Sequence, residues 1–313
     1  MKKSIHLFLV VYVFSTLATF SCKENEPEPA PTENLNFFFS VDDALKQVAF
    51  TAMINYGDVF QWDFGDGNTS SERNPVNTYA EGGSYFVTLK VTGKGATKEI
   101  TKRVSLALSN LQMLAGDNTY PEGKKWKISS NHSDTDRLAW ADEPFTVYEG
   151  TYLPAGALGM ALGLGDAYDD EYLFTRNGGY QRLARHGGSF AGLIYVLMNG
   201  INILTPSSDA SYPFCYAEYA PKAAMFTFTE NQDFTIMTAA YSNVGNVTYQ
   251  NVNTLSFSEN EFIGFLDYTR KCIVLSLTPS TMQLAFFACL DPSAAAAGGI
   301  PTHAIILTFE EVK

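Results

Sequence analysis

The feature that most constrains the fold is the stretch FQWDFGDG at residues 60–67. Trp62 and Phe64 alternate with Asp63, so on a β-strand both aromatic rings point to one face and enter a core. The Gly-Asp-Gly at 65–67 supplies the residues that a tight turn prefers. The stretch therefore predicts a half-buried strand that ends in a turn.

The chain around this stretch has the same character. Apolar and polar residues alternate in short segments, with turn-forming residues between them, at 36–41, 48–52, 85–91 and 99–104. Short strands at this spacing within about 75 residues are typical of a small antiparallel sandwich.

Residues 35–107 resemble a PKD domain, a small immunoglobulin-like sandwich. The resemblance rests on WDFGDG at 62–67 and on the motifs after it, Asn74-Pro75, Tyr79 and GSYFVTL at 83–89. Domains of this family mostly serve as spacers or adhesion modules, so the resemblance implies such a role here. Asp63 and Asp66 either ligate a metal or stabilise the turn. We favour the turn, because strand and turn chemistry accounts for both residues.

The N-terminus has the pattern of an export signal. Lys2 and Lys3 precede an apolar run, which predicts a signal peptide over residues 1–21. The following Cys22 ends a stretch, TFSC, that resembles a lipobox, so we expect Cys22 to carry a lipid. Residues 22–34 are polar and proline-rich, as in an extended tether.

The charge of the chain limits its partners. The formal net charge is −12, which repels phosphate backbones and offers no basic patch to anionic lipids. We therefore expect no nucleic acid partner and a membrane contact through the lipid alone. Acidic residues just after Cys22 resemble the signal that sends lipoproteins to the outer face of the outer membrane.

The remainder of the chain predicts a second β domain. Residues 108–123 are rich in turn-formers and are predicted as a linker, and 124–313 as a larger, jelly-roll-like β-sandwich or a barrel. Together with the immunoglobulin-like first sandwich, this makes an all-β chain. The strands expected in the second domain are Lys125–Ser129, Glu171–Thr175, Gly192–Asn199, Ala224–Thr229, Asp233–Thr238, Thr254–Phe257, Cys272–Leu277, Met282–Ala288 and Ala304–Phe309.

The second domain is similar to C-terminal domains that follow PKD modules in lipoproteins of glycan-utilisation loci. The similarity rests on GKKW at 123–126, YDDEYLF at 168–174, the segment 224–236 and IVLSL at 273–277. It implies a β-sandwich, surface display and carbohydrate binding. We expect a polysaccharide or oligosaccharide ligand, with an outer-membrane transporter complex as a further partner.

Sugar recognition needs flat aromatic faces with polar groups beside them. Trp126 lies within a strand and is predicted to be core. Core packing is the competing interpretation for each aromatic residue in a loop-like context. Those candidates are Trp140, Tyr148, Tyr152, Tyr168, Tyr212, Tyr216, Tyr219 and Tyr241. The polar partners expected beside them are Asp142, Asp169, Asn243 and Asn246.

The densest carboxylate cluster is Asp166, Asp169, Asp170 and Glu171. Its first three members either hold calcium, which accepts several oxygens from one loop, or form a charged turn. We expect no other cofactor. Neighbouring Asp169 and Asp170 point to opposite faces of a strand and cannot together flank a glycosidic bond. No Gly-x-Ser-x-Gly or zinc-ligand spacing occurs.

We therefore expect no enzymatic activity and favour a non-catalytic surface lipoprotein that binds carbohydrate. Two alternatives stay open. One is an adhesion or structural protein of a surface complex, and the other is a glycoside hydrolase that uses Asp170 and Glu171. Cys215, Cys272 and Cys289 permit one disulfide or three buried thiols.

Overall fold

The computed structural model describes residues 34–55, 57–93 and 95–313. The contacts divide the chain into two compact units, the second of which takes Val104–Lys313 together with Val41–Gln47 and Thr78–Tyr85. The predicted signal peptide and the lipidation at Cys22 lie outside the described residues. Among the described residues, no helix has both the length and the apolar character that crossing a bilayer requires.

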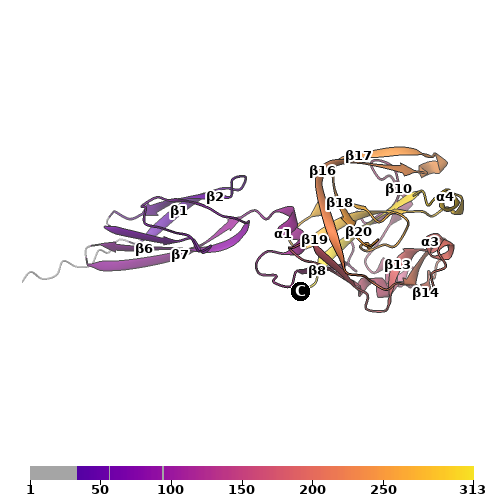
Figure 1. The fold of residues 1–313 in the computed structure, drawn as a ribbon, viewed down its shortest axis with the longest axis horizontal. Coiled ribbons are helices and arrows are strands. Elements are labelled where there is room, and N and C mark those ends of the chain that lie inside the picture. The colour runs from indigo at the N-terminus through magenta and orange to yellow at the C-terminus, as the bar shows by residue number, and fades with distance from the viewer. Residues whose placement is uncertain (1–33, 56, 94) are drawn as a thin grey trace, which may run out of the picture. The chain divides into compact units, whose positions relative to one another are not determined.

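The first domain is built from two small antiparallel sheets (Figure 1). Their orders are β1-β2-β5 and β4-β3-β6-β7. The strands are β1 (Asn36–Asp42), β2 (Gln47–Met53), β3 (Val59–Asp63), β4 (Thr69–Ser70), β5 (Val76–Thr78), β6 (Gly83–Gly93) and β7 (Ala96–Leu106).

The FQWDFGDG stretch forms β3 and the turn after it, as the sequence predicts. Trp62 and Phe64 are buried, and Trp62 packs edge-on against Phe37 with ring centroids 5.2 Å apart. The Asp66 carboxylate accepts a backbone hydrogen bond from Asn68 at 3.0 Å and one from the Asn77 side chain at 2.8 Å. Asp66 therefore stabilises the turn.

The second domain is a larger β-sandwich, and its elements are drawn from magenta to yellow in Figure 1. Its strands are β8 (Lys124–Ile128), β9 (Arg137–Trp140), β10 (Val147–Tyr152), β11 (Glu171–Phe174), β12 (Gly179–Leu183), β13 (Gly188–Gly192), β14 (Ile203–Pro206), β15 (Phe214–Glu218), β16 (Ala224–Thr238), β17 (Gly245–Phe257), β18 (Cys272–Leu277), β19 (Thr281–Ala288) and β20 (His303–Glu311). Its helices are α1 (Asn110–Ala115), α2 (Ala157–Met160), η1 (Gly165–Tyr168), α3 (Leu193–Met198), η2 (Ala240–Ser242) and α4 (Pro292–Ala296).

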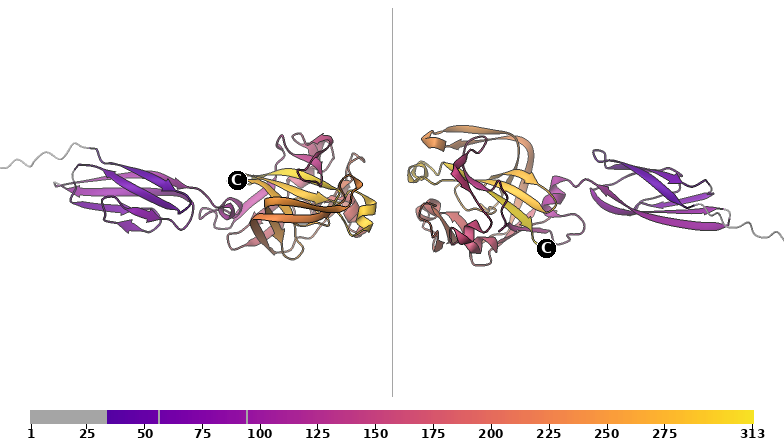
Figure 2. Two further views of the ribbon diagram at one scale, coloured as in Figure 1. Left: turned by 90° about the horizontal axis from the view of Figure 1, so that it is seen from above. Right: turned by 180° about the vertical axis from the view of Figure 1, so that it is seen from behind.

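The main sheet of this domain closes on itself. Its order is β10-β9-β20-β19-β18-β17-β16-β12-β11-β8, and β8 also pairs with β20. The strands from β16 to β20 pair in chain order as an up-and-down meander, whereas a jelly roll would use Greek-key crossings. The long β16–β17 hairpin, orange in Figure 2, extends beyond its neighbours, and β13, β15 and β14 form a separate small sheet.

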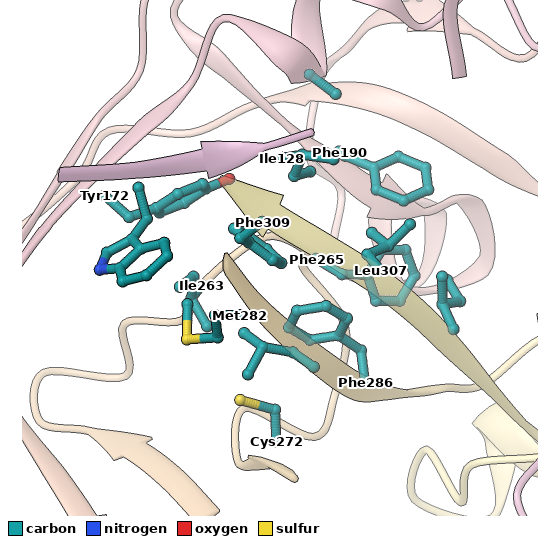
Figure 3. Packing of buried hydrophobic residues seen from close by; sticks show 14 of the residues in the cluster. Ile128, Tyr172, Phe190, Ile263, Phe265, Cys272, Met282, Phe286, Leu307 and Phe309 are labelled. Atoms are coloured by element: carbon teal, nitrogen blue, oxygen red, sulfur yellow. The ribbon is translucent and has the colours of Figure 1, made fainter. Parts of the chain in front are cut away.

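The ring encloses the main core. Ile128, Tyr172, Phe286, Leu307 and Phe309 are among its buried members (Figure 3). Trp126 is fully buried, as predicted. The expectation of an all-β chain, with an immunoglobulin-like sandwich followed by a larger β-sandwich, is confirmed.

The segment predicted as a linker contributes to this core. Ser109 caps α1 and forms a capping box with Gln112, the pattern that stabilises a helix start. Leu114 at the end of α1 is buried in the main core, and its carbonyl oxygen accepts a 2.7 Å hydrogen bond from the Trp126 indole.

One predicted strand is wrong. Residues 192–199 form α3 and its two caps, because a short apolar run does not distinguish a strand from a helix. Gly200, with φ 63°, follows the helix and permits the turn that ends it. Cys215, Cys272 and Cys289 are all free and buried.

Candidate functional site

Three aromatic residues predicted to bind sugar lie together at one end of the second domain. The Trp140 ring lies between Tyr241, with centroids 4.4 Å apart, and His303, with centroids 4.5 Å apart. Tyr148 packs edge-on against both Trp140 and His303. We call Trp140, Tyr148, Tyr241 and His303 the aromatic cluster.

Strand register and a hairpin connection bring the cluster together. Trp140 is the last residue of β9 and His303 the first of β20, and the two are directly paired. Tyr148 lies on β10, which pairs with β9. Tyr241 belongs to η2, in the connection between β16 and β17. Segments more than 160 residues apart in the sequence therefore meet here, as Trp140 and His303 show.

Tyr241 is the exposed member of the cluster, with 47% of its surface open to solvent. Its backbone is left-handed at φ 52° and ψ 31°, and Ser242 follows at φ 62°. For a residue other than glycine, the left-handed backbone conformation is less stable than the right-handed one by about 1–2 kcal/mol. It therefore persists only where contacts with the surrounding structure stabilise it. The stack on Trp140 is one such contact. The other is a 3.1 Å hydrogen bond from the Tyr241 hydroxyl to Asp142.

Asp142 is the polar group of the site. Its carboxylate also accepts 2.8 Å bonds from the backbone N–H and the hydroxyl of Thr146, which fix its orientation. The predicted partners Asn243 and Asn246 are exposed, and Asn243 lies two residues after Tyr241.

His303 is held neutral by its surroundings. Burial lowers the pKa of His303 to about 4, because desolvation disfavours the charged imidazole. Its Nδ1 lies 2.8 Å from the Thr302 hydroxyl, while Nε2 is buried and has no hydrogen-bond partner in the described part of the chain. The sequence offered no signal for His303, because a lone histidine at the start of a strand has no distinctive pattern.

Two further candidate tyrosines, Tyr152 and Tyr212, line an apolar pocket of about 80 Å³. The pocket lies beside α2, and its wall also includes Leu138 and Phe190. Tyr152 and Tyr212 therefore belong to the pocket lining and not to the aromatic cluster.

Tyr216, which the sequence suggested as a sugar-binding residue, is fully buried and exposes no ring face to a ligand. Its hydroxyl donates to Asp170 at 3.1 Å. Tyr219 is half-buried, packs against Phe262 and donates to buried Glu261. Both residues support the fold.

Tyr168 belongs to a buried hydrogen-bond network. The two ring nitrogens of His132 lie 2.8 Å from the Asp136 carboxylate and 2.8 Å from the Tyr168 hydroxyl. The same hydroxyl accepts a bond from the backbone N–H of Leu158 in α2. The network therefore fixes the position of the helix that borders the pocket.

The carboxylate cluster does not converge on a common point. Asp170 is buried and pairs with Arg182 at 3.2 Å, Asp169 pairs with His186 at the surface, and Asp166 is exposed. Burial raises the pKa of Asp170 to about 6, and Arg182 partly offsets this effect. Among the described residues, no three acidic, histidine or cysteine side chains form a group that could hold a metal.

The predicted hydrolase pair is separated in the same way. Glu171 forms ion pairs with Lys125 at 3.1 Å and with Arg185 at 2.6 Å. The Asp170 carboxylate is sealed inside the fold, so the two groups do not face a shared space.

Comparison with known proteins identifies the family of the first domain. Residues 41–107 match the sequence model of the PKD domain family. The microbial collagenase of Vibrio alginolyticus is 39% identical over 62 residues, which is 20% of this chain and 7% of the collagenase. Collagenase ColQ1 of Bacillus cereus is 36% identical over 89 residues, 26% of this chain and 9% of that protein. The chain therefore spans less than a tenth of these relatives.

Two solved PKD domains are similar to part of this chain. The PKD1 domain of Vibrio anguillarum Epp is 32% identical, with 24% of this chain and 94% of that domain covered and a TM-score of 0.22. The PKD1 domain of the Vibrio cholerae metalloprotease PrtV is also 32% identical, with 23% and 93% covered and a TM-score of 0.21. The first domain of this protein is therefore a PKD domain.

Proposed function

We propose that the protein is a non-catalytic, lipid-anchored surface protein that binds carbohydrate through the aromatic cluster. A PKD domain fits a surface or extracellular protein. In this proposal Cys22 carries the lipid at the outer membrane, the PKD domain is a spacer, and the second domain presents captured polysaccharide to a transporter complex.

The observation that carries the proposal is the stack of Tyr241 on Trp140 and His303. Aromatic faces bind the apolar face of a pyranose, and a rigid ring loses little entropy when it does so. Tyr241 is backed on one side by Trp140 and remains half-exposed, so its outer face is available. Asp142 lies beside the ring, where a carboxylate accepts hydrogen bonds from sugar hydroxyls.

The ion pairs of Asp170 with Arg182 and of Glu171 with Lys125 and Arg185 support binding without reaction. Acid–base catalysis on a sugar needs two carboxyl groups on opposite sides of the bond. The carboxylate beside the aromatic cluster is that of Asp142, whose oxygens accept hydrogen bonds from Thr146 and Tyr241.

The test is binding of the soluble protein, residues 34–313, to a panel of neutral polysaccharides by affinity gel electrophoresis and calorimetry. We expect at least one polysaccharide to retard the protein, and Tyr241→Ala to weaken that binding by about ten-fold or more, as for a central aromatic contact. Phe86→Ala, at an exposed aromatic residue of the PKD domain, is the matched control and should leave binding unchanged. Equal binding by wild type and Tyr241→Ala would refute the site.

A second candidate function is attachment to a protein partner. Leu197 and Met198, at the end of α3, are 62% and 59% exposed, and exposed apolar surface is typical of protein interfaces. Pull-down from native membranes with wild type and Leu197→Asp separates this function from the first. Loss of a captured partner in the variant, with glycan binding intact, would favour attachment.

A further inference from the structure

The apolar pocket beside α2 has no role in the stack described above, and its lining is unusual for a protein that binds sugar. Leucine, alanine, proline and phenylalanine side chains form most of the wall, and the pocket contains no charged residue. The lining residues that carry a polar side-chain group are Thr151, Tyr152 and Tyr212. Such a wall favours an apolar group and disfavours a charge, because an unpaired charge loses its hydration there.

The strand register places this pocket next to the aromatic cluster. Trp140 pairs with His303, and Leu138 pairs with Ile305 two residues along the same strands. Residues two apart on a strand point to the same face and lie about 7 Å apart. Leu138 and Ile305 line the pocket, so the pocket wall continues directly from the base of the aromatic cluster.

The size of the pocket limits what enters it. An apolar cavity of about 150 Å³ holds one benzene, which has six non-hydrogen atoms. By the same ratio, the pocket volume of about 80 Å³ accommodates about three non-hydrogen atoms. A pyranose ring is too large, whereas an acetyl group has this size.

We propose that the pocket binds a short, uncharged acyl substituent, such as an O-acetyl group, carried by a glycan that stacks on the aromatic cluster. This inference rests on the proposed function and narrows its ligand to acylated neutral glycans. The methyl group enters the apolar wall, and Thr151, Tyr152 and Tyr212 are the lining residues that carry a hydroxyl able to donate to the ester carbonyl.

The experiment compares acetylated xylan and acetylated glucomannan with the same preparations after mild alkaline deacetylation. We expect the wild-type protein to bind one acetylated form about three- to ten-fold more tightly than its deacetylated counterpart, the range for burial of a methyl group and its carbonyl carbon. Ala161 lines the pocket and is exposed, so Ala161→Phe fills the pocket with little effect on the core. This variant should lose the preference and still bind the deacetylated glycan.

The outcomes separate the two proposals. Equal affinity of wild type for both forms of a bound glycan overturns the acyl pocket and leaves the aromatic cluster intact. A preference that Ala161→Phe does not change also overturns it. If neither glycan binds, methyl acetate is titrated into the protein labelled at leucine methyl groups. Shifts of Leu138 and Leu158 that Ala161→Phe abolishes support the pocket while the glycan function fails, and unchanged spectra overturn the pocket as well.

Discussion

Asp136 holds together the network beside the pocket, and its replacement by asparagine should destabilise the second domain. The carboxylate is fully buried. One oxygen accepts bonds from the hydroxyls of Ser133 and Thr308, both at 2.7 Å, and from Gln283 at 2.9 Å. The other accepts from the Thr308 backbone N–H at 2.8 Å and lies 2.8 Å from His132.

Asparagine keeps the shape of this side chain and one of its two oxygens. Its amide group then faces the Thr308 N–H, a donor against a donor, and an unsatisfied buried N–H costs about 2 kcal/mol. The bonds that remain lose their ionic character, which costs about 1 kcal/mol more. Asp136→Asn should therefore lower the free energy of unfolding by about 3 kcal/mol, or the melting temperature by about 6–12 °C for a domain of this size.

The same variant should change the response to acid. Burial alone would raise the pKa of Asp136, but hydrogen bonds from His132, Ser133 and Thr308 lower it from 3.8 to about 2. Because the folded pKa lies below the unfolded one, this stabilisation is complete above pH about 4 and is lost as the pH falls through about 2. Wild type should lose about 2 kcal/mol more than Asp136→Asn between pH 5 and pH 2.

Differential scanning calorimetry across this pH range, with hydrogen exchange to locate the change, measures both effects. Asp169→Asn is the control, because Asp169 is an exposed carboxylate and its change should stay within about 0.5 kcal/mol of wild type. An Asp136→Asn protein as stable as wild type at pH 7, or an identical acid response of the two proteins, would refute the assigned role of the network.

Three other features give direct tests. Trp126→Ala should destabilise the second domain by about 3–5 kcal/mol, because Trp126 is fully buried and its indole hydrogen bond to α1 is lost. Urea unfolding measures the change in the free energy of unfolding, and a loss below about 1 kcal/mol would contradict the prediction. Burial raises the pKa values of the Cys215, Cys272 and Cys289 thiols to about 11, 12 and 11. An aromatic disulfide reagent should therefore react with these thiols only after denaturant is added. Rapid labelling of the native protein would contradict this expectation. Asp66→Ala should lower the free energy of unfolding of the PKD domain by about 1 kcal/mol, because the turn loses the hydrogen bonds that Asp66 accepts. The wild-type protein should have the same melting temperature in calcium and in chelator. A shift of that temperature with calcium would restore the metal interpretation.

The PKD domain was predictable because its determinants are local. The alternation of Trp62 and Phe64 and the turn residues after them specify a strand, a buried face and a turn within eight positions of the chain. The regular strands β11, β18 and β19 were predicted for the same reason. Segment 192–199 was not, since its apolar run fits a strand and a helix equally well.

The sequence identified Trp140, Tyr148 and Tyr241 as aromatic residues in polar surroundings. Only the tertiary structure decided which aromatics share a site, because β9, β10, β20 and η2 are distant in the chain and meet through strand pairing. Only the tertiary structure likewise shows that Tyr216 and Asp170 are buried. The sequence lists the side chains that are present. Which of them are exposed, and which of them contact one another, depends on contacts between distant segments that no local pattern specifies.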